Sequence, residues 1–337
     1  MEYNNTKSKT ASLVKLIGIP GVCKSSSSQL RTEDLQGFLQ IAKQNKIPLL
    51  FLRAIADRLE DYSFRSELLR YEEKHKKFLD LIVFIAYLLE KAGTPYTLFK
   101  TLKPFPYAPS DVDVLLLSDV DLKIVVKSLE REGCIPLERN IQGITLFSPK
   151  HKMNIDITTQ VAVSSLIYMN KALLFDHVME SKMNGTYIQT LKPSADLLTV
   201  AAHSLFKEQL YMLSDYYTLV MLSEHWKETL KIAGKFYLKH AIETALKMTR
   251  AVTFVAFGSS DPLMQKFEEL DISNATGLTD HEFELPRKYD LSTIVLAFLN
   301  KIKADPVSKN SLPLIALSAA HPTFYRKVIE HATRKKY

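Results

Sequence analysis

The chain has 337 residues, of which 46% are hydrophobic and 24% are charged, a balance typical of a globular protein with large buried cores. This composition excludes intrinsic disorder as the main state. Only 10 residues are glycine, well below the usual share of about 7%. Glycine-rich sandwiches, propellers and collagen-like arrays are therefore disfavoured, and we expect a helix-rich architecture.

The charge balance favours an anionic partner. There are 44 Lys and Arg residues against 37 Asp and Glu, which gives a formal net charge of +7. RNA is one partner that such a charge suits, although the basic residues are spread evenly along the chain. The two cysteines, Cys23 and Cys134, lie far apart without metal-ligand spacing, so we expect free thiols in a reducing compartment.

No membrane segment is expected. The first ten residues are polar and lack the apolar centre of a signal peptide. The most apolar stretch, Phe78 to Leu89, is interrupted by Asp80 and is too short to span a bilayer. We therefore predict a cytoplasmic protein without a membrane partner.

Residues 1–93 are predicted to form an N-terminal helical arm. Apolar residues recur at helical spacing from Leu35 to Ala42, and similar patterns run through Ile47 to Leu59 and Ser66 to Ala92. Closer to the start, the short apolar run from Leu13 to Ile17 is predicted to be a strand.

Residues 94–190 are predicted to form an α+β domain. Tyr96 to Phe99 has the pattern of a short strand, and Val112 to Leu117 that of a fully buried strand. A helix with one apolar face is expected to begin after Ser118 and to end at Gly133.

Two further strands, Ile144 to Ser148 and Met153 to Thr158, are separated by a four-residue turn that suits an antiparallel hairpin. From residue 191 to residue 337 the apolar periods are again helical, which predicts a C-terminal helical domain. The expected fold class is thus α+β, with a small mixed-sheet core between N-terminal helices and a C-terminal helical bundle.

The pattern with most chemical content is Asp-Val-Asp at the start of the buried strand. Residues two apart in a strand face the same way, so Asp111 and Asp113 present both carboxylates together. In the later strand, Asp156 alternates with apolar Ile155 and Ile157. If the two strands are neighbours, three carboxylates converge on an oxygen-only site suited to Mg²⁺. The alternative is a strand edge with solvated charges.

These patterns resemble the nucleotidyltransferase superfamily of DNA polymerase β, and most closely a prokaryotic branch of uncharacterised nucleotidyltransferases. The resemblance runs from about residue 33 to about residue 225. The stretches that carry it are Tyr96-Thr97-Leu98-Phe99-Lys100-Thr101, Ser110-Asp111-Val112-Asp113-Val114, Asn154-Ile155-Asp156-Ile157, Pro193-Ser194-Ala195-Asp196-Leu197 and Leu213-Ser214-Asp215-Tyr216.

The resemblance implies transfer of a nucleoside monophosphate from a nucleoside triphosphate, such as ATP, to a hydroxyl acceptor. Asp111, Asp113 and Asp156 would be the catalytic and metal-binding residues, holding two Mg²⁺ ions. The nucleotide would be bound by Lys100, Thr101, Ser110 and Asp215. The acceptor, whether RNA, protein or a small molecule, is left open by the sequence.

One position departs from the family pattern. Thr101 stands where the family has glycine, and its side chain is expected to crowd the approach of a triphosphate. A catalytically inactive relative that binds nucleotide or nucleic acid is therefore an alternative.

A second alternative is a P-loop NTPase. Residues 18–25, Gly-Ile-Pro-Gly-Val-Cys-Lys-Ser, match the P-loop consensus except at Cys23, where the last glycine is expected. This interpretation needs a strand directly before the loop, which is the prediction for Leu13 to Ile17.

Overall fold

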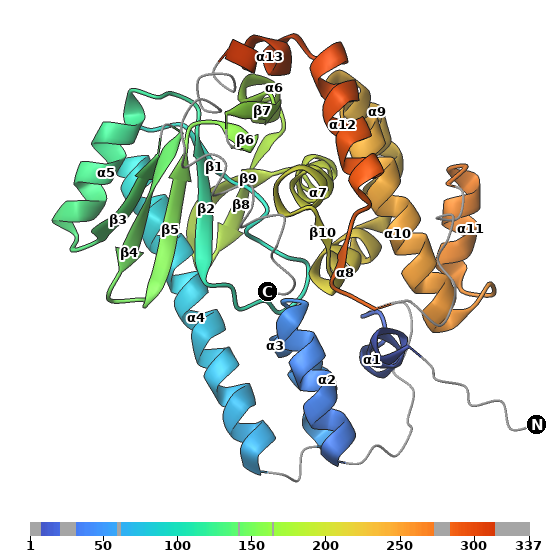
Figure 1. The fold of residues 1–337 in the computed structure, drawn as a ribbon. Helices are drawn as coiled ribbons and strands as arrows, with labels where there is room; N and C mark the ends of the chain where they lie inside the picture. Colours follow the sequence, from blue (N-terminus) through green and yellow to red (C-terminus); the bar gives the residue numbers. More distant parts are fainter. Residues whose placement is uncertain are drawn as a thin grey trace, which may run out of the picture.

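The structure, a computed structural model, describes residues 8–20, 32–58, 62–140, 142–163, 165–272 and 284–313. It has an α+β fold in which helices flank both faces of a seven-stranded mixed sheet (Figure 1). The predicted fold class is confirmed. Within the described ranges, every helix is too short or too polar to cross a membrane.

Four α-helices form the N-terminal part, α1 (Lys9–Ile17), α2 (Thr32–Gln44), α3 (Pro48–Ala54) and α4 (Tyr62–Lys91), with a short 3-10 turn, η1 (Ala56–Arg58), after α3. The strand predicted for Leu13 to Ile17 is wrong, because these residues belong to α1. A short apolar run does not by itself distinguish a buried helix from a strand. Here Ser8 caps the helix by accepting a hydrogen bond from the backbone N–H of Ala11.

This correction removes the strand that a P-loop requires before its phosphate-binding turn. Residues 21–25 of the near-consensus stretch, including Cys23, lie outside the described residues. Cys134 is buried and free, as predicted.

The strand order in the sheet is β3-β4-β5-β2-β1-β9-β8. Parallel pairs form between β2 and β5 and between β1 and β9, and the other neighbours are antiparallel. The strand bounds are β1 (Tyr96–Leu98), β2 (Asp111–Leu116), β3 (Ile135–Asn140), β4 (Gly143–Ser148), β5 (Met153–Thr158), β8 (Val178–Met183) and β9 (Thr186–Leu191). The predicted hairpin is confirmed as β4 and β5.

Our sequence interpretation missed the β8–β9 hairpin, although its turn carries a clear signal. Asn184 and Gly185 both have positive φ angles, +48° and +84°. Asn-Gly is the preferred pair for such a two-residue turn, because both residues tolerate the left-handed conformation. The parallel pairing of β9 with β1 extends the sheet beyond the strands that we predicted.

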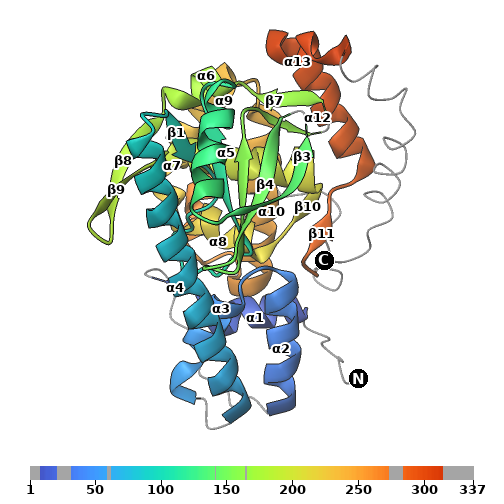
Figure 2. The same ribbon diagram turned by 90° about the vertical axis from the view of Figure 1, so that its left-hand side faces the viewer.

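One face of the sheet is covered by α4 and α5 (Asp121–Arg131), as Figure 2 shows. On α4 the apolar side chains of Phe78, Ile82 and Ile85 recur at helical spacing and are at most 1% exposed. They belong to one core with the inward side chains of the sheet, among them Val112 and Ile155. The predicted helix after Ser118 is confirmed as α5.

The other face is covered by helices from the last third of the chain, which confirms that this part is helical. The longest of these belong to one large core together with α1–α3. The elements are α7 (Pro193–Ala202), η2, which is a π-helical turn (His203–Glu208, the π-turn), α8 (Leu213–Met221), η3 (Ser223–His225), α9 (Trp226–Lys235), α10 (Lys239–Phe257), α11 (Pro262–Glu269), α12 (Leu291–Ala304) and α13 (Pro306–Asn310). Smaller elements are β6 (Val161–Val163), β7 (Leu166–Met169), α6 (Lys171–Phe175), β10 (Leu210–Tyr211) and β11 (Arg287–Lys288).

Buried hydrogen bonds join the N-terminal helices to residues much later in the chain. The Thr10 hydroxyl accepts from the backbone N–H of Leu285 at 3.0 Å. The fully buried Asn45 amide donates to the Leu285 carbonyl at 2.8 Å and accepts from the backbone N–H of Leu213 at 3.0 Å. The first and last parts of the chain therefore complete one another's polar groups inside a shared core.

Gly143 gives a test of the β4–β5 register. A Cβ atom on Gly143 would lie 2.1 Å from the carbonyl oxygen of Ile157 on the adjoining strand. We expect Gly143→Ala to lower the free energy of unfolding by about 1–3 kcal/mol, because two backbones must separate. Urea unfolding followed by circular dichroism measures this.

The matched control is Gly234→Ala in α9, where no atom lies within 4 Å of the new Cβ. Alanine is the better helix former, so this variant should be neutral or gain up to about 1 kcal/mol. Equal effects of the two substitutions would contradict the register described here.

Candidate active site

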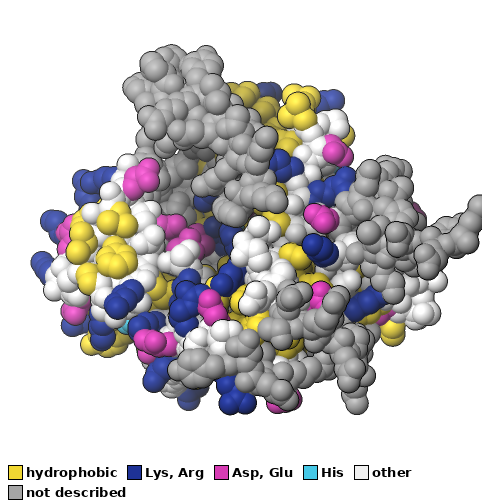
Figure 3. All heavy atoms as spheres, turned by 60° about the horizontal axis from the view of Figure 1, so that its bottom comes forward, with side chains coloured by type: hydrophobic (Ala, Val, Ile, Leu, Met, Phe, Trp, Pro, Cys, Tyr) yellow, Lys and Arg dark blue, Asp and Glu magenta, His cyan; other side chains and the backbone are white. Residues whose placement is uncertain are grey.

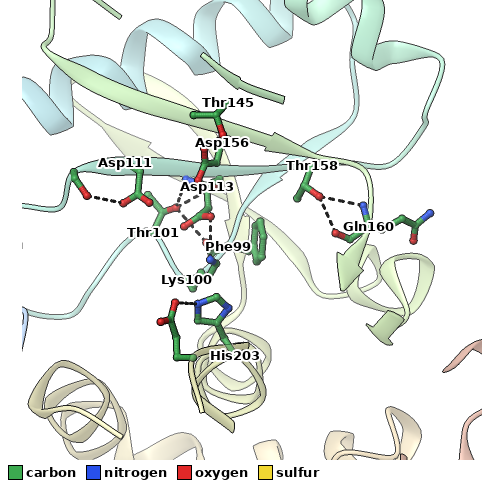
Figure 4. Close-up of polar contacts among 12 residues, drawn as sticks. Phe99, Lys100, Thr101, Asp111, Asp113, Thr145, Asp156, Thr158, Gln160 and His203 are labelled. Carbon is green, nitrogen blue, oxygen red and sulfur yellow. Dashed lines mark hydrogen bonds and ion pairs between the residues drawn. The ribbon is translucent and has the colours of Figure 1, made fainter. Parts of the chain in front are cut away.

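Three carboxylates lie on one face of two adjoining strands. In the parallel pairing of β2 with β5, Asp113 is in register with Asp156, and Asp111 with Asn154. Asp111 and Asp113 are two residues apart and share a face, while Val112 between them is buried in the core on the opposite side. The strands that we expected to be neighbours are neighbours, and Figure 4 shows the Asp113 and Asp156 side chains next to each other.

A lysine at the end of β1 is bound to the middle carboxylate. The Lys100 ammonium lies 2.9 Å from Asp113 Oδ1, and the two side chains are only 12% and 17% exposed. Thr145 on β4 donates a hydrogen bond of 2.6 Å to Asp156 Oδ1. Two of the three carboxylates therefore have a cation or donor placed against them by a neighbouring strand.

The two aspartates of β2 have opposite electrostatic surroundings. Burial alone would raise the pKa of Asp113, but the Lys100 ammonium attracts its charged form and holds its pKa below the ordinary value. Burial and the nearby charge of Asp113 raise the pKa of Asp111. Asp111 is thus the carboxylate whose charge is least compensated by this protein's own groups.

The Thr101 side chain points into the sheet. It is 3% exposed, and its hydroxyl accepts from the backbone N–H of Asp113 at 3.0 Å while lying 3.1 Å from the carbonyls of Phe99 and Asp113. Thr101 therefore extends the contact between the end of β1 and β2 by side-chain hydrogen bonds. Its hydroxyl is engaged with the backbone in this structure, and a direct contact with nucleotide stays a prediction.

Lys100 has a left-handed backbone, with a φ angle of +51°. Its backbone N–H donates to Asp196 Oδ1 at 2.9 Å, and Asp196 lies in the first turn of α7. This hydrogen bond favours a conformation that a residue with a Cβ adopts only at a cost. The Pro-Ser-Ala-Asp segment thus positions the turn that carries Lys100.

Two of the predicted nucleotide-binding residues, Ser110 and Asp215, lie on other elements than Lys100 and Thr101. Ser110 is exposed, immediately before β2, and its hydroxyl lies 3.4 Å from Asp111 Oδ1. Asp215 lies in the first turn of α8, where it accepts from the backbone N–H of Met212 at 3.0 Å. Among charged side chains, Lys103 has the largest effect on the pKa of Asp215, which it lowers. Asp215 therefore lies near a second lysine, and its role in nucleotide binding stays a prediction.

The sequence interpretation treated His203, on the π-turn, only as a polar group packed within apolar helices and did not place it near Lys100. His203 Nε2 lies 3.1 Å from Glu208 Oε1, and the His203 Nδ1 lies 3.4 Å from the Tyr168 hydroxyl. Burial, and next the Lys100 charge, lower the pKa of His203 to about 3, so the imidazole is neutral at pH 7. Figure 4 shows His203 directed toward Lys100.

Lys207 on the same turn escaped the sequence interpretation. Repulsion by the Lys100 ammonium, followed by burial, lowers the pKa of Lys207. A π-turn shifts side chains out of the ordinary helical spacing, and such turns are frequent at functional sites. His203 and Lys207 are four residues apart on this turn.

The donor atoms suit a divalent cation in type. Three carboxylates offer only oxygen, which is the chemistry that Mg²⁺ requires. As the side chains are placed, however, no three His, Cys, Asp or Glu residues form a ready metal centre in the described part of the chain. Lys100 lies against Asp113 and Thr145 against Asp156. The three carboxylates therefore fit a metal in donor chemistry, while Asp113 is paired with Lys100 in this structure.

Basic side chains also mark the surface at this end of the molecule. Figure 3 views the lower end of Figure 1, where Lys and Arg side chains gather near the middle of the face with acidic side chains among them.

Thr101 provides the first test of the site. Thr101→Val should lower the free energy of unfolding by about 1–3 kcal/mol, because the buried N–H of Asp113 loses its acceptor. Thr101→Ser keeps the hydroxyl and should cost less than about 1 kcal/mol. Urea unfolding of both variants measures the difference. Equal losses would show that packing, not the hydroxyl, joins β1 to β2.

Asp215 provides a test by pH. Burial raises its pKa to about 6 from the ordinary 3.8. Between these values the unfolded chain releases the proton first, so the stability of the native protein falls as pH rises from about 4 to 6. Asp215→Asn keeps an oxygen acceptor without the titration. The stability of the variant relative to the native chain should rise by about 2–3 kcal/mol across this interval.

Unfolding free energies measured from pH 4 to pH 7 test this expectation. The control is Asp290→Asn, which removes an exposed aspartate just before α12. A relative stability of Asp215→Asn that does not differ from that of the control across the interval would contradict the raised pKa.

Comparison with known proteins gives little beyond this geometry. No protein-family model matches the sequence. No curated protein matches it with significance. A crystal structure of an antigenic nucleotidyltransferase-like protein from Paracoccidioides brasiliensis is similar, with a TM-score of 0.33 and 12% sequence identity, over 58% of this chain and 91% of that chain. A likeness this weak carries no argument about function, which must be argued from the site itself.

Proposed function

We propose that this chain is a Mg²⁺-dependent nucleotidyltransferase, which moves a nucleoside monophosphate from a nucleoside triphosphate to a hydroxyl acceptor. The observation that supports it best is the placement of Asp111, Asp113 and Asp156 on one face of the paired strands β2 and β5. Three carboxylates held side by side repel one another, and a protein that keeps them together without a ligand gains no stability from doing so.

In the proposed reaction, Asp111, Asp113 and Asp156 would hold Mg²⁺. The metal supplies charge neutralisation of the triphosphate and a lowered pKa for the acceptor hydroxyl. The protein's own part is positioning. The strands fix the spacing of the carboxylates, and Thr145 orients Asp156 by its hydrogen bond. Such positioning contributes most of the catalysis in phosphoryl-group chemistry.

Lysines near the carboxylates support a phosphate-rich substrate. Lys100 forms an ion pair with Asp113. Repulsion by the Lys100 ammonium is the largest cause of the lowered pKa of Lys207. Burial lowers the pKa of Lys103, which is attracted by Asp215 and Asp196. Ammonium groups that repel one another attract an anion strongly, because the anion offsets their mutual repulsion. We propose that Lys100 and Lys207 contact the phosphates of the substrate.

The net charge of +7 favours RNA among the hydroxyl acceptors. Protein side chains and small metabolites carry the same reacting group, and the carboxylates would act on any of them alike. The acceptor is therefore an outcome of the experiment below.

A second candidate is a protein that binds nucleotide without turnover. The observation that favours it is the Lys100–Asp113 ion pair, which occupies the carboxylate that a metal would need. The two candidates differ in one result, the formation of a covalent product.

The test is incubation of the full chain with labelled nucleoside triphosphates, Mg²⁺, and RNA, protein and small-molecule hydroxyl acceptors. We expect labelled product and pyrophosphate from the native chain. Asp111→Asn, Asp113→Asn and Asp156→Asn should each reduce turnover by about 10²-fold or more, because each removes charge from the metal-binding set. Circular dichroism checks that the variants fold.

The matched control is Glu130→Gln, which removes an exposed carboxylate on α5 behind the opposite face of the sheet. It should leave turnover unchanged. Nucleotide binding without product, measured by calorimetry in Mg²⁺, would favour the second candidate. Absence of both product and binding with all four nucleotides would reject both.

A further inference from the structure

The Lys100 ammonium lies where a divalent cation would compete with it. It contacts Asp113 Oδ1 at 2.9 Å, and Asp113 is the carboxylate between Asp111 on its own strand and Asp156 on the next. A carboxylate that already has a cation at hydrogen-bond distance, in a site only 12–17% exposed, attracts a second cation weakly.

The backbone beneath this ammonium is held on two sides. Asp196 accepts from the Lys100 backbone N–H, and the Thr101 hydroxyl bonds to the backbone of Asp113. Neither hydrogen bond involves the ammonium itself. Lys100 can therefore move its charge by rotating its side chain, while the turn and both strands stay in place.

The surroundings of Lys100 are balanced between attraction and repulsion. Asp113, Asp111 and Glu208 attract the ammonium. Lys207 repels the ammonium, and this repulsion weakens when the Lys100 charge moves away. The neutral imidazole of His203 is directed toward Lys100. A triphosphate placed among these lysines would add several negative charges that compete with Asp113 for the ammonium.

We propose that Lys100 is a resident counter-cation that couples metal binding to nucleotide binding. Without nucleotide it neutralises Asp113 and keeps divalent cations out. A bound nucleoside triphosphate draws the ammonium onto its phosphates and frees Asp113 for Mg²⁺. This inference rests on the proposed function, since it assumes that the carboxylates bind a metal with the substrate.

The first test counts bound Mn²⁺ by electron paramagnetic resonance without nucleotide. The native full-length chain should bind Mn²⁺ weakly. Lys100→Gln, which removes the charge and keeps a polar side chain, should bind it on the order of tenfold more tightly or better. Lys100→Gln combined with Asp113→Asn should lose that gain. Lys127→Gln, an exposed lysine on α5, is the matched control and should behave like the native chain.

The second test uses the native chain alone, so it decides the question even if Lys100→Gln does not fold. Its thermal midpoint is measured with Mg²⁺, with a non-hydrolysable triphosphate analogue, and with both. We expect no shift with Mg²⁺ alone, and a larger shift with both than with the analogue alone.

Two results would overturn the inference and leave the proposed function standing. One is tight metal binding by the native chain without nucleotide, seen either as Mn²⁺ binding as tight as that of Lys100→Gln or as a thermal shift with Mg²⁺ alone. The other is a Lys100→Gln variant that folds and binds no Mn²⁺, while Mg²⁺ and analogue together still stabilise the native chain. If Mg²⁺ alters neither protein under any condition, the inference and the proposed function both fail.

Discussion

The repulsion between neighbouring carboxylates constrains this structure more than any other interaction. Asp113 and Asp156 are opposite one another on parallel strands, and Asp111 follows on the same face. Like charges at this spacing oppose folding unless a cation lies between them or a proton is taken up. The protein places an ammonium against Asp113 and a hydroxyl donor against Asp156, and burial together with the charge of Asp113 raises the pKa of Asp111. The strand geometry is therefore tied to the position of Lys100.

Lys100 is itself positioned by groups from three separate elements. The end of β1 carries it, Asp196 of α7 holds its backbone in the left-handed conformation, and Asp113 of β2 binds its charge. Thr101, the next residue, bonds β1 to β2 through its hydroxyl. A glycine would leave the Asp113 N–H without this acceptor. Thr101 thus has a structural role in this chain, and its side chain points into the sheet.

The sequence predicted the site correctly where the hydrophobic period of a strand and the position of its aspartates agreed. Alternation of aspartate with valine and isoleucine predicted both site strands, while their pairing entered the sequence interpretation only as a condition, which the structure meets. The sequence interpretation failed at Leu13 to Ile17, where a short apolar run fits helix and strand alike. It interpreted His203 as a polar group packed in an apolar helix and did not single out Lys207, and both residues lie on the π-turn. Asn45, whose amide joins its own helix to two distant segments, has no local pattern that distinguishes it from a surface asparagine.

The hydrogen bonds of Thr10 and Asn45 to Leu285 have a consequence for biosynthesis. The first helices are synthesised long before Leu285. The hydrogen bonds of Thr10 and Asn45 to that residue can form only after most of the residues between them have been made. Closing so long a loop is slow, and the exposed segments are open to association with other chains meanwhile. Expression at lower temperature or with a chaperone that shields nascent chains should therefore raise the yield of folded protein.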